Sequence, residues 1–418
     1  MRWKFGMSVI LATALFGSCQ KGSAPGKVPV KVGLDRVSEA EFRGFFEGKT
    51  LGIVTNHTAM DHQGRFITAV FQEMPEVSVG ALFGPEHGIR GQAEAGAKVD
   101  SGQDPLHGVP IYSLYGKTRK PSPEMLQGID ALVFDIQDVG ARFYTYIYTM
   151  AYAMEAAAEN DLPIIVLDRP NPITGKVEGN ILDTAYASFV GRFPIPQRHG
   201  MTVAELAALF NEAGWIGKDL KADLKVVPMA GWRRDLWFDQ TDLTFVNPSP
   251  NIPGPGTATV YPATCLIEGT NLSEGRGTPL PFRVFGAPWL NTTALVEKLN
   301  SLSLEGVSFG DTLFIPVRIP GAAENPKYRE KTCRGITVKV TNRDAFSVFR
   351  SGVSIVNAIQ ELHPDSLKWR EGAFDRLTGT NRIRLAIQKG ESMAPVFAWA
   401  AGQAADFERK ARPYLLYE

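Results

Sequence analysis

The chain has 418 residues, which is enough for two domains of ordinary size. Hydrophobic residues make up 44% and charged residues 21% of the chain, a composition typical of globular proteins and not of disordered ones. Lys plus Arg and Asp plus Glu both total 44, so the formal net charge is zero and nothing in the charge balance indicates a nucleic-acid partner.

The first residues resemble an export signal. Arg2 and Lys4 precede a short apolar run at residues 7–16, and small residues then precede Cys19. The run is too short to cross a bilayer as a helix, which takes ~20 apolar residues. Residues 1–19 therefore predict a signal peptide of the lipoprotein type, with Cys19 as the lipidated residue; the alternative is an ordinary signal peptide with a chance cysteine. Residues 20–28, rich in Gly, Ser, Pro and Lys, predict a flexible tether.

Residues 29–240 predict a Rossmann-like domain. Short apolar runs separated by helical stretches indicate a parallel sheet that is covered on both faces. Thr202 lies three residues before Glu205, which is a capping-box pattern at the start of a helix. The expected strands are residues 51–55, 77–83, 131–136 and 163–167, and the expected helices are residues 64–74, 143–159 and 202–213.

Residues 241–418 predict a smaller α+β domain. It opens with a stretch rich in Pro and Gly at residues 247–257, which we expect to be a loop. Its expected strands are residues 313–318 and 336–340, and its expected helices are residues 345–362 and 394–409. Cys265 and Cys333 are predicted to be buried and unpaired, because a chain of this size does not depend on a disulfide framework.

Polar residues follow each predicted strand of the first domain. The carboxyl ends of parallel strands lie along one edge of a sheet, and ligands bind in the crevice there. We therefore expect these side chains to form one polar site, although Asp138 alone is also a natural helix cap. The residues concerned are Asn56 after the first strand, Glu86, His87 and Arg90 after the second, Asp135, Asp138 and Arg142 after the third, and Asp168 and Arg169 after the fourth.

Glu86 is the best catalytic candidate of this set. Pro85 and Gly88 bracket Glu86 and His87, and they predict a tight turn that holds both side chains at the edge of the sheet. A second-sphere hydrogen-bonding role for His87 stays open.

Several other chemistries lack their motifs. The position after the first strand holds TNHTAMDHQG where a dinucleotide-binding domain would have G-x-G-x-x-G, and no Walker A sequence occurs. There is no H-E-x-x-H pattern and no G-x-S-x-G motif. The sequence therefore predicts no metal and no cofactor, although a metal-dependent hydrolase with Asp135, Asp138, His87 and Asp168 as ligands stays an alternative.

A second polar cluster, EGTNLSEGRGT, spans residues 268–278. We expect this loop to close over the sheet edge and to offer Asn271, Glu274 and Arg276 to a ligand. Gly275 and Gly277 would let the backbone approach that ligand closely. The alternative is a solvated surface loop.

These motifs carry a family likeness. The sequences LGIVTNHT, LFGPEHGIRG, FDIQDVGARFYTY, VLDRPNPITG, PQRHGMT, EGTNLSEGRGT and RPYLLYE together resemble the NamZ-type exo-β-N-acetylmuramidases, a family of bacterial glycoside hydrolases. The resemblance runs from about residue 32 to the end of the chain. It implies a Rossmann-like domain, a smaller C-terminal domain and an active site in the cleft between them.

The resemblance also implies a reaction, namely release of terminal β-linked N-acetylmuramic acid from the non-reducing end of peptidoglycan fragments. The glutamate of the family's PEHG motif corresponds to Glu86, which we expect to be the general acid. Asp135 or Asp138 would then orient the substrate's own acetamido group. An arginine suits the lactyl carboxylate of muramic acid because its planar group grips a carboxylate at two points; the candidates are Arg142, Arg169, Arg198 and Arg276.

Two other functions remain open at this point. A lipoprotein that binds cell-wall sugars without cleaving them fits the same architecture, and a metal-dependent hydrolase is the other alternative. The expected partners are a peptidoglycan-derived saccharide and, through a lipid on Cys19 alone, a membrane. The expected location is the periplasm or the cell envelope.

Overall fold

The computed structural model describes residues 26–91, 102–104, 108–116 and 118–418. Cys19 and the predicted signal peptide lie outside the described residues. Among those residues, no helix combines the length and the apolar character that crossing a bilayer requires.

A seven-stranded sheet organises the first half of the chain, in the order β3-β4-β2-β1-β5-β6-β9. All neighbouring strands pair in parallel except β3 and β4 at one edge. The predicted Rossmann-like sheet and its four predicted strands are confirmed. The strands are β1 (Thr50–Thr55), β2 (Ser78–Gly84), β3 (Gly102–Gln103), β4 (Pro110–Ser113), β5 (Ala131–Asp135), β6 (Pro163–Leu167) and β9 (Asp223–Val227).

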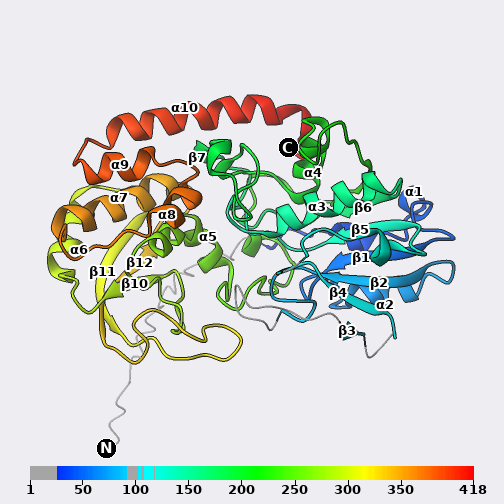
Figure 1. Cartoon of the computed structure of the whole chain (residues 1–418), viewed down its shortest axis with the longest axis horizontal. Helices are drawn as coiled ribbons and strands as arrows, with labels where there is room; N and C mark the ends of the chain where they lie inside the picture. The colour runs from blue at the N-terminus through cyan, green and yellow to red at the C-terminus, as the bar shows by residue number, and fades with distance from the viewer. Residues whose placement is uncertain (1–25, 92–101, 105–107, 117) are drawn as a thin grey trace, which may run out of the picture.

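Helices cover both faces of this sheet (Figure 1). Successive side chains of a strand point to opposite faces, so Val54 packs into one apolar core and Ile53 into another. The first core contains residues of α3 (Tyr146–Glu159) and α4 (Val203–Glu212), and the second those of α1 (Ala40–Arg43) and α2 (Ile67–Gln72). This two-sided burial is why the strands are apolar throughout.

The predicted capping box at the start of α4 is confirmed. The Thr202 hydroxyl accepts a hydrogen bond from the Glu205 backbone N–H, and the Glu205 carboxylate accepts one from the Thr202 N–H at 2.9 Å.

A smaller antiparallel sheet, in the order β10-β12-β11, lies in the second half of the chain. The predicted strand at residues 313–318 is wrong for its last four residues, because antiparallel pairing with β12 places the strand earlier and ends it at Phe314, opposite Cys333. Pro316 has no N–H with which to continue the hydrogen bonds between the strands. The elements are β10 (Val284–Ala287), β11 (Val307–Phe314), β12 (Cys333–Val340), α6 (Thr292–Ser301), α7 (Val348–Leu362), α8 (Glu371–Thr378) and α9 (Arg382–Gln388).

The stretch at residues 247–257, expected to be a loop throughout, ends in a helix. Helix α5 spans Pro255–Thr264, with Pro255 in its first turn. Proline is well tolerated there because the first N–H groups of a helix have no intrahelical partner. The boundary predicted between residues 240 and 241 falls between the two sheets and stays a prediction.

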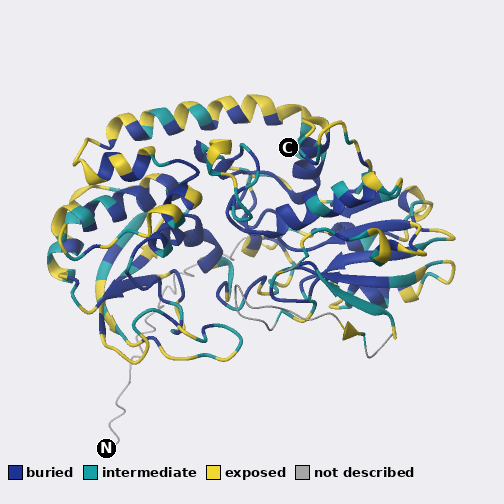
Figure 2. Ribbon diagram, in the orientation of Figure 1, coloured by how far each residue is buried: buried dark blue, intermediate teal, exposed yellow. Residues whose placement is uncertain are grey.

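One apolar core joins the two halves. Val54 and Phe134 of the large sheet belong to the same cluster as Phe285 and Ile336 of the small sheet, with α5 between them. Figure 2 shows buried segments in both halves of the molecule, on both sheets. The two halves are therefore packed together over a shared interior.

The last helix runs along both halves. Helix α10 (Ala394–Ala411) crosses the top of the view in Figure 1. It packs against β7 (Glu178–Ile181), which pairs with β8 (Pro196–Arg198) in a two-stranded sheet. Gln403 accepts a hydrogen bond from the Ile181 N–H at 3.1 Å, so α10 is tied to the first half of the chain.

The chain end then docks onto the first domain. The Tyr417 hydroxyl donates to the Asp168 carboxylate at 2.6 Å and accepts from the Met229 N–H at 2.8 Å. The Tyr417 ring packs edge-on against Trp232. These contacts fasten the last residues of the protein to the carboxyl end of β6.

Replacing Tyr417 by Phe removes this hydroxyl and leaves a buried carboxylate one donor short. We expect Tyr417→Phe to lower the free energy of unfolding by about 1.5–3 kcal/mol, the usual contribution of a hydrogen bond to a charged group. Urea unfolding of both proteins above pH 7, where Asp168 is ionised because its pKa is about 7, would measure the difference. Tyr414→Phe is the matched control and should not change the midpoint; an unaltered midpoint for both variants would contradict this role of Tyr417.

Asp168 also gives stability a pH dependence. Burial raises the pKa of Asp168 to about 7, against the hydrogen bonds from Tyr417 and Ala204, which favour the carboxylate. In the unfolded chain this pKa is about 3.9. The folded protein thus holds a proton that the unfolded chain releases, so this contribution to stability is full below about pH 4 and falls as the pH rises toward 7. Asp168→Asn should flatten that part of the pH profile of unfolding.

Both remaining cysteines are as predicted. Cys265 and Cys333 are free and buried.

Candidate active site

The strand order brings the predicted polar residues to one edge. β2, β1, β5 and β6 are consecutive in the sheet and parallel. Their carboxyl ends lead directly to Glu86, Asn56, Asp135 and Asp168. The predicted convergence of these four segments is therefore confirmed.

Glu86 sits in the tight turn that the sequence predicts. The Gly88 N–H donates to the Pro85 carbonyl at 2.9 Å. His87 is buried and has a φ of 70°, in the left-handed region that a side chain rarely adopts. The turn directs the half-buried Glu86 side chain toward α3, where the Thr145 hydroxyl donates to its Oε2 at 2.9 Å.

Three tyrosines surround the Glu86 carboxylate. The Tyr115 hydroxyl hydrogen-bonds to it, and burial, together with this carboxylate, raises the pKa of Tyr115 well above its usual value. The Tyr146 hydroxyl lies 3.5 Å from the Glu86 carbonyl oxygen and donates to the Pro248 carbonyl at 2.7 Å. Tyr144 packs edge-on against Tyr146, with 4.8 Å between the ring centroids. Glu86 therefore lies in a partly apolar, hydroxyl-lined environment.

One buried polar atom near Tyr146 lacks a partner. Asp138 Oδ1 makes no hydrogen bond to any residue that the structure describes. Tyr146 interacts electrostatically with both Glu86 and Asp138, and its hydroxyl hydrogen-bonds to the Asn56 side chain. Buried polar atoms are nearly always paired, so a free acceptor among the described residues around Tyr146 indicates a place where a ligand binds.

The other carboxylate oxygen of Asp138, Oδ2, is bound by protein groups. Its Oδ2 accepts from the Gly140 N–H at 2.7 Å and faces His199 Nε2 at 3.2 Å. His199 Nδ1 accepts from the Met201 N–H at 3.2 Å, so the ring proton of neutral His199 is on Nε2, where it donates to Asp138. This fixes the orientation of Asp138 and leaves Oδ1 as the atom available to a ligand.

Asp135 and Arg169 neutralise one another. Asp135 is fully buried, and Arg169 binds both of its oxygens through Nε and through Nη2, the latter at 2.8 Å. Burial raises the pKa of Asp135 above its usual value, although Arg169 opposes that shift. The pair is a structural element at the base of the site, and it leaves neither group free for a substrate.

Asp168 has a structural role of the same kind. Its two oxygens accept from the Thr202 hydroxyl at 2.8 Å and the Ala204 N–H at 3.0 Å, besides Tyr417. It therefore caps α4 and holds the chain end, and nothing in its surroundings leaves a face for a ligand.

Two of the arginines predicted to bind substrate are bound to other groups of the protein. Arg142 is fully buried, and its guanidinium donates to four backbone carbonyls, among them Thr378 at 2.8 Å. Burial lowers the pKa of Arg142 to about 10, so it stays charged at neutral pH. Arg198 is buried and pairs with Glu178 at 2.8 Å. Neither can reach a lactyl carboxylate in this arrangement. Arg90, by contrast, is exposed at the end of the turn.

The second polar cluster packs on the C-terminal half. Asn271 binds the backbone of Ser366 and Lys368, and Gly275 and Gly277 have φ of 82° and 80°. A side chain on either glycine would collide with a backbone carbonyl, that of Val284 at 2.6 Å for Gly275 and that of Val317 at 2.5 Å for Gly277. We expected these glycines to let the backbone approach a ligand. Instead, they let this loop pack closely against the protein's own backbone.

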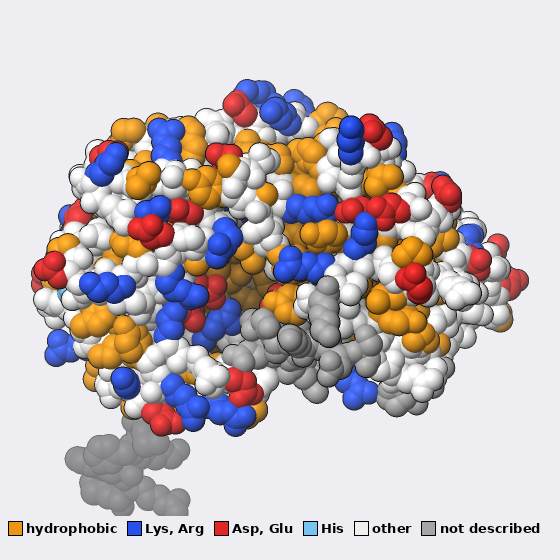
Figure 3. All heavy atoms as spheres, viewed as in Figure 1, with side chains coloured by type: hydrophobic (Ala, Val, Ile, Leu, Met, Phe, Trp, Pro, Cys, Tyr) orange, Lys and Arg blue, Asp and Glu red, His pale blue; other side chains and the backbone are white. Residues whose placement is uncertain are grey.

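Glu274 and Arg276 nevertheless line a cavity of about 350 Å³. Arg276 Nε lies 3.4 Å from Glu274 and 3.1 Å from Glu268, and Lys327 lies 3.1 Å from Glu274. Tyr261 interacts with Glu268 and Arg276 and packs against Tyr144, which links this cavity to the surroundings of Glu86. Figure 3 shows a hollow between the two halves, with acidic and basic side chains gathered on one side of it.

Sequence reasoning missed three residues of this site. Tyr115 and Thr145 contact Glu86, and His199 holds Asp138. Tyr115 lies after β4, a short strand next to the edge strand β3, with no strong apolar pattern. His199 stands in the motif PQRHGMT, but its proximity to Asp138 depends on the pairing of residues 61 positions apart.

No group of three or more His, Cys, Asp or Glu residues suited to a metal occurs within the described ranges.

The chain is similar to known proteins along nearly its whole length. Residues 51–255 match the family model described as exo-β-N-acetylmuramidase NamZ, N-terminal, and residues 259–417 match its C-terminal counterpart. A relative from Bacillus subtilis (strain 168), named peptidoglycan β-N-acetylmuramidase NamZ, is 46% identical over 399 residues, covering 95% of this chain and 94% of the relative.

Two crystal structures of DUF1343 family proteins from Bacteroides fragilis NCTC 9343 share the fold. One superposes with a TM-score of 0.85 at 37% identity, covering 94% of this chain and all of the other. The second has a TM-score of 0.76 at 34% identity and covers 93% of this chain and 99% of the other. Together with the matched family models, these relatives show that the chain belongs to the exo-β-N-acetylmuramidase NamZ family.

Proposed function

We propose that this protein is an exo-acting glycoside hydrolase that releases terminal β-linked N-acetylmuramic acid from the non-reducing end of peptidoglycan fragments, with Glu86 as the proton donor. The observation that carries the proposal is the placement of Glu86. In a chain of this family, its carboxyl group lies at the ligand-binding edge of the sheet, near the buried Asp138 Oδ1, which has no partner among the described residues.

Glu86 is placed to protonate the leaving oxygen. The glycosidic C1–O bond breaks as the carboxyl group of Glu86 transfers its proton to that oxygen. The Glu86 carboxylate that remains can then take a proton from the water that completes hydrolysis. Thr145 and Tyr115 fix the orientation of the carboxyl group during both steps.

Asp138 and Asn56 suit the acetamido group of the substrate. A 2-acetamido sugar carries one N–H donor and one carbonyl acceptor. Asp138 Oδ1, which has no partner among the described residues, is an acceptor for the N–H, and the Asn56 amide beside Tyr146 is a donor to a sugar oxygen. With its N–H held by Asp138, the acetamido carbonyl oxygen can attack C1 as the glycosidic bond breaks, which is the substrate-assisted route.

Arg276 is our candidate for the lactyl carboxylate. Of the four arginines predicted for this role, Arg142, Arg169 and Arg198 are bound to buried protein groups. Arg276 lines the open cavity together with two further cations, Lys327 and Arg370, against the two acids Glu268 and Glu274. The excess of one positive charge matches a single carboxylate.

Hydrolysis of a chromogenic β-N-acetylmuramide tests the function directly. We expect release of the chromophore, and much slower release from the matching β-N-acetylglucosaminide, which lacks the lactyl carboxylate. Activity should survive a chelator, because Asp135 and Asp168 already have protein partners and are not free to bind a metal. Binding without release would support the sugar-binding alternative, and loss of activity in chelator would support the metal-dependent one.

The lipid anchor on Cys19 is a separate proposal. It is supported by the positive start, the short apolar run and the small residues before this cysteine. We propose that the protein is exported and held in the cell envelope by this lipid. Cys19→Ala should move the protein from the membrane fraction to the soluble fraction of a bacterial host; an unchanged membrane fraction would contradict the anchor.

A further inference from the structure

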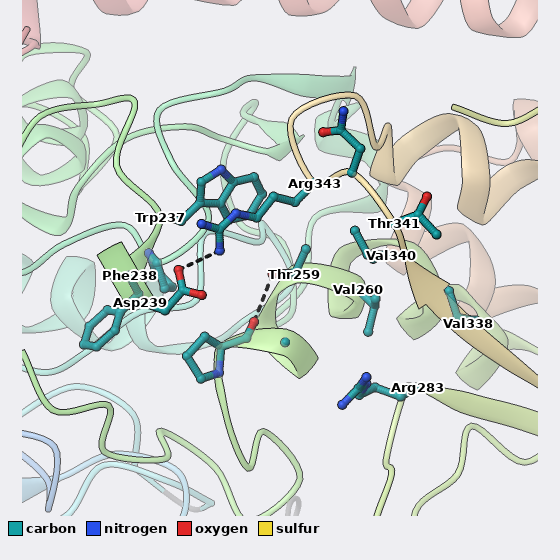
Figure 4. A pocket seen from close by; sticks show the side chains of 14 residues that line it. Trp237, Phe238, Asp239, Thr259, Val260, Arg283, Val338, Val340, Thr341 and Arg343 are labelled. Carbon is teal, nitrogen blue, oxygen red and sulfur yellow. Dashed lines mark hydrogen bonds and ion pairs between the residues drawn. The ribbon is translucent and has the colours of Figure 1, made fainter. Parts of the chain in front are cut away.

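A second cavity lies between the two halves of the chain, and its lining contains none of the residues proposed to act on the glycosidic bond. It has a volume of about 480 Å³, within the usual range for small-molecule sites. Residues 237–239 form one wall, the first turns of α5 form the base, and residues 338–343 at the end of β12 form the other wall (Figure 4).

The lining combines an aliphatic surface with two guanidinium groups. Val340 and Pro255, which are partly exposed, supply the accessible apolar part, and Arg283 and Arg343 lie at its margins (Figure 4). Arg343 Nη1 pairs with Asp239 at 2.6 Å, and its guanidinium lies over the Trp237 ring at 4.9 Å. The position of Arg343 is thereby fixed from both sides.

Arg283 differs from Arg343 in having no acidic partner. Its side chain is exposed and makes no hydrogen bond or ion pair with any residue in the described ranges 26–91, 102–104, 108–116 and 118–418. With Asp239 as the single acid in the lining, the cavity carries an excess of one positive charge. A ligand with one carboxylate therefore complements it.

The chemistry of the rest of the ligand must complement the lining other than its charged groups. The aromatic rings of the lining offer no open face on which a sugar ring could stack, because Trp237 and Phe238 are each 4% exposed and the Trp237 ring already contacts the guanidinium groups of Arg198 and Arg343. The accessible apolar surface is aliphatic. We propose that this cavity is a second binding site, which takes the carboxylate end of a short aliphatic peptide.

In this arrangement the ligand carboxylate binds Arg283, and small aliphatic side chains lie on Val340 and Pro255. A free peptide ammonium can pair with Asp239, whose side chain is about half exposed at 55%. Since Asp239 belongs to the first half of the chain and Arg283 to the second, a bound peptide would bridge the two halves.

Calorimetric titration of the mature protein with tri-alanine tests this site. We expect a dissociation constant on the order of 0.1–1 mM, typical for a ligand of this size. Tri-alanine amide, which lacks the carboxylate, and the variant Arg283→Gln should each bind at least about tenfold more weakly.

Two further variants make the result specific. Arg329→Gln removes an exposed arginine that pairs with Glu330 outside the cavity, so its affinity should equal that of the wild type. Val340→Phe fills the aliphatic surface and should abolish binding while leaving the exposed Arg283 in place. Equal affinity for the peptide and its amide, or unchanged affinity in Arg283→Gln, would overturn the proposal, as would the absence of binding to the wild type.

Discussion

Replacing Glu86 by Gln is expected to reduce turnover roughly 10²–10⁴-fold, the usual contribution of a general acid. The amide has nearly the same shape and still accepts a hydrogen bond from the Thr145 hydroxyl at the position of Oε2. It cannot, however, deliver a proton to the glycosidic oxygen. The loss should appear in kcat, with little change in KM, because the contacts proposed to hold the sugar come from other residues.

The measurement is steady-state hydrolysis of a chromogenic β-N-acetylmuramide. Circular dichroism and the unfolding midpoint of the variant should match those of the wild type, because Glu86 is only half-buried. Glu305→Gln, at an exposed position, is the matched control and should retain full turnover. Wild-type turnover in Glu86→Gln would remove Glu86 from the mechanism.

The largest effect on stability is expected for Arg169→Met. This change leaves the fully buried Asp135 carboxylate without its cation. Breaking a buried ion pair by removing one partner is strongly destabilising, by about 3–5 kcal/mol, because the remaining charge stays buried and uncompensated. Urea unfolding would measure the change in free energy.

The double variant Asp135→Asn/Arg169→Met separates charge from packing. With the carboxylate replaced, no unpaired charge remains, and we expect the double variant to be more stable than Arg169→Met alone. Arg233→Met removes an exposed arginine paired with Asp235 and should leave the midpoint nearly unchanged. If the double variant is as unstable as Arg169→Met, the ion pair is not the cause.

Much of the fold follows from local patterns. The runs at residues 51–55, 131–136 and 163–167 are apolar because both faces of the sheet are covered, and that pattern does not depend on distant contacts. Helix α4 has its cap in the adjacent residues Thr202 and Glu205. The start of α5 was missed, because Pro and Gly are typical both of loops and of the first turn of a helix.

The sequence by itself determined that polar groups stand after four parallel strands and that Glu86 lies in a tight turn among them. It could not determine which of those groups are free. The Arg142 guanidinium donates to carbonyls of Leu377 and Thr378, and Asp168 accepts from Tyr417, in each case across more than 200 residues of sequence. Only the tertiary structure brings such partners together, so it alone separates these bound charges from Asp138, whose Oδ1 has no partner among the described residues.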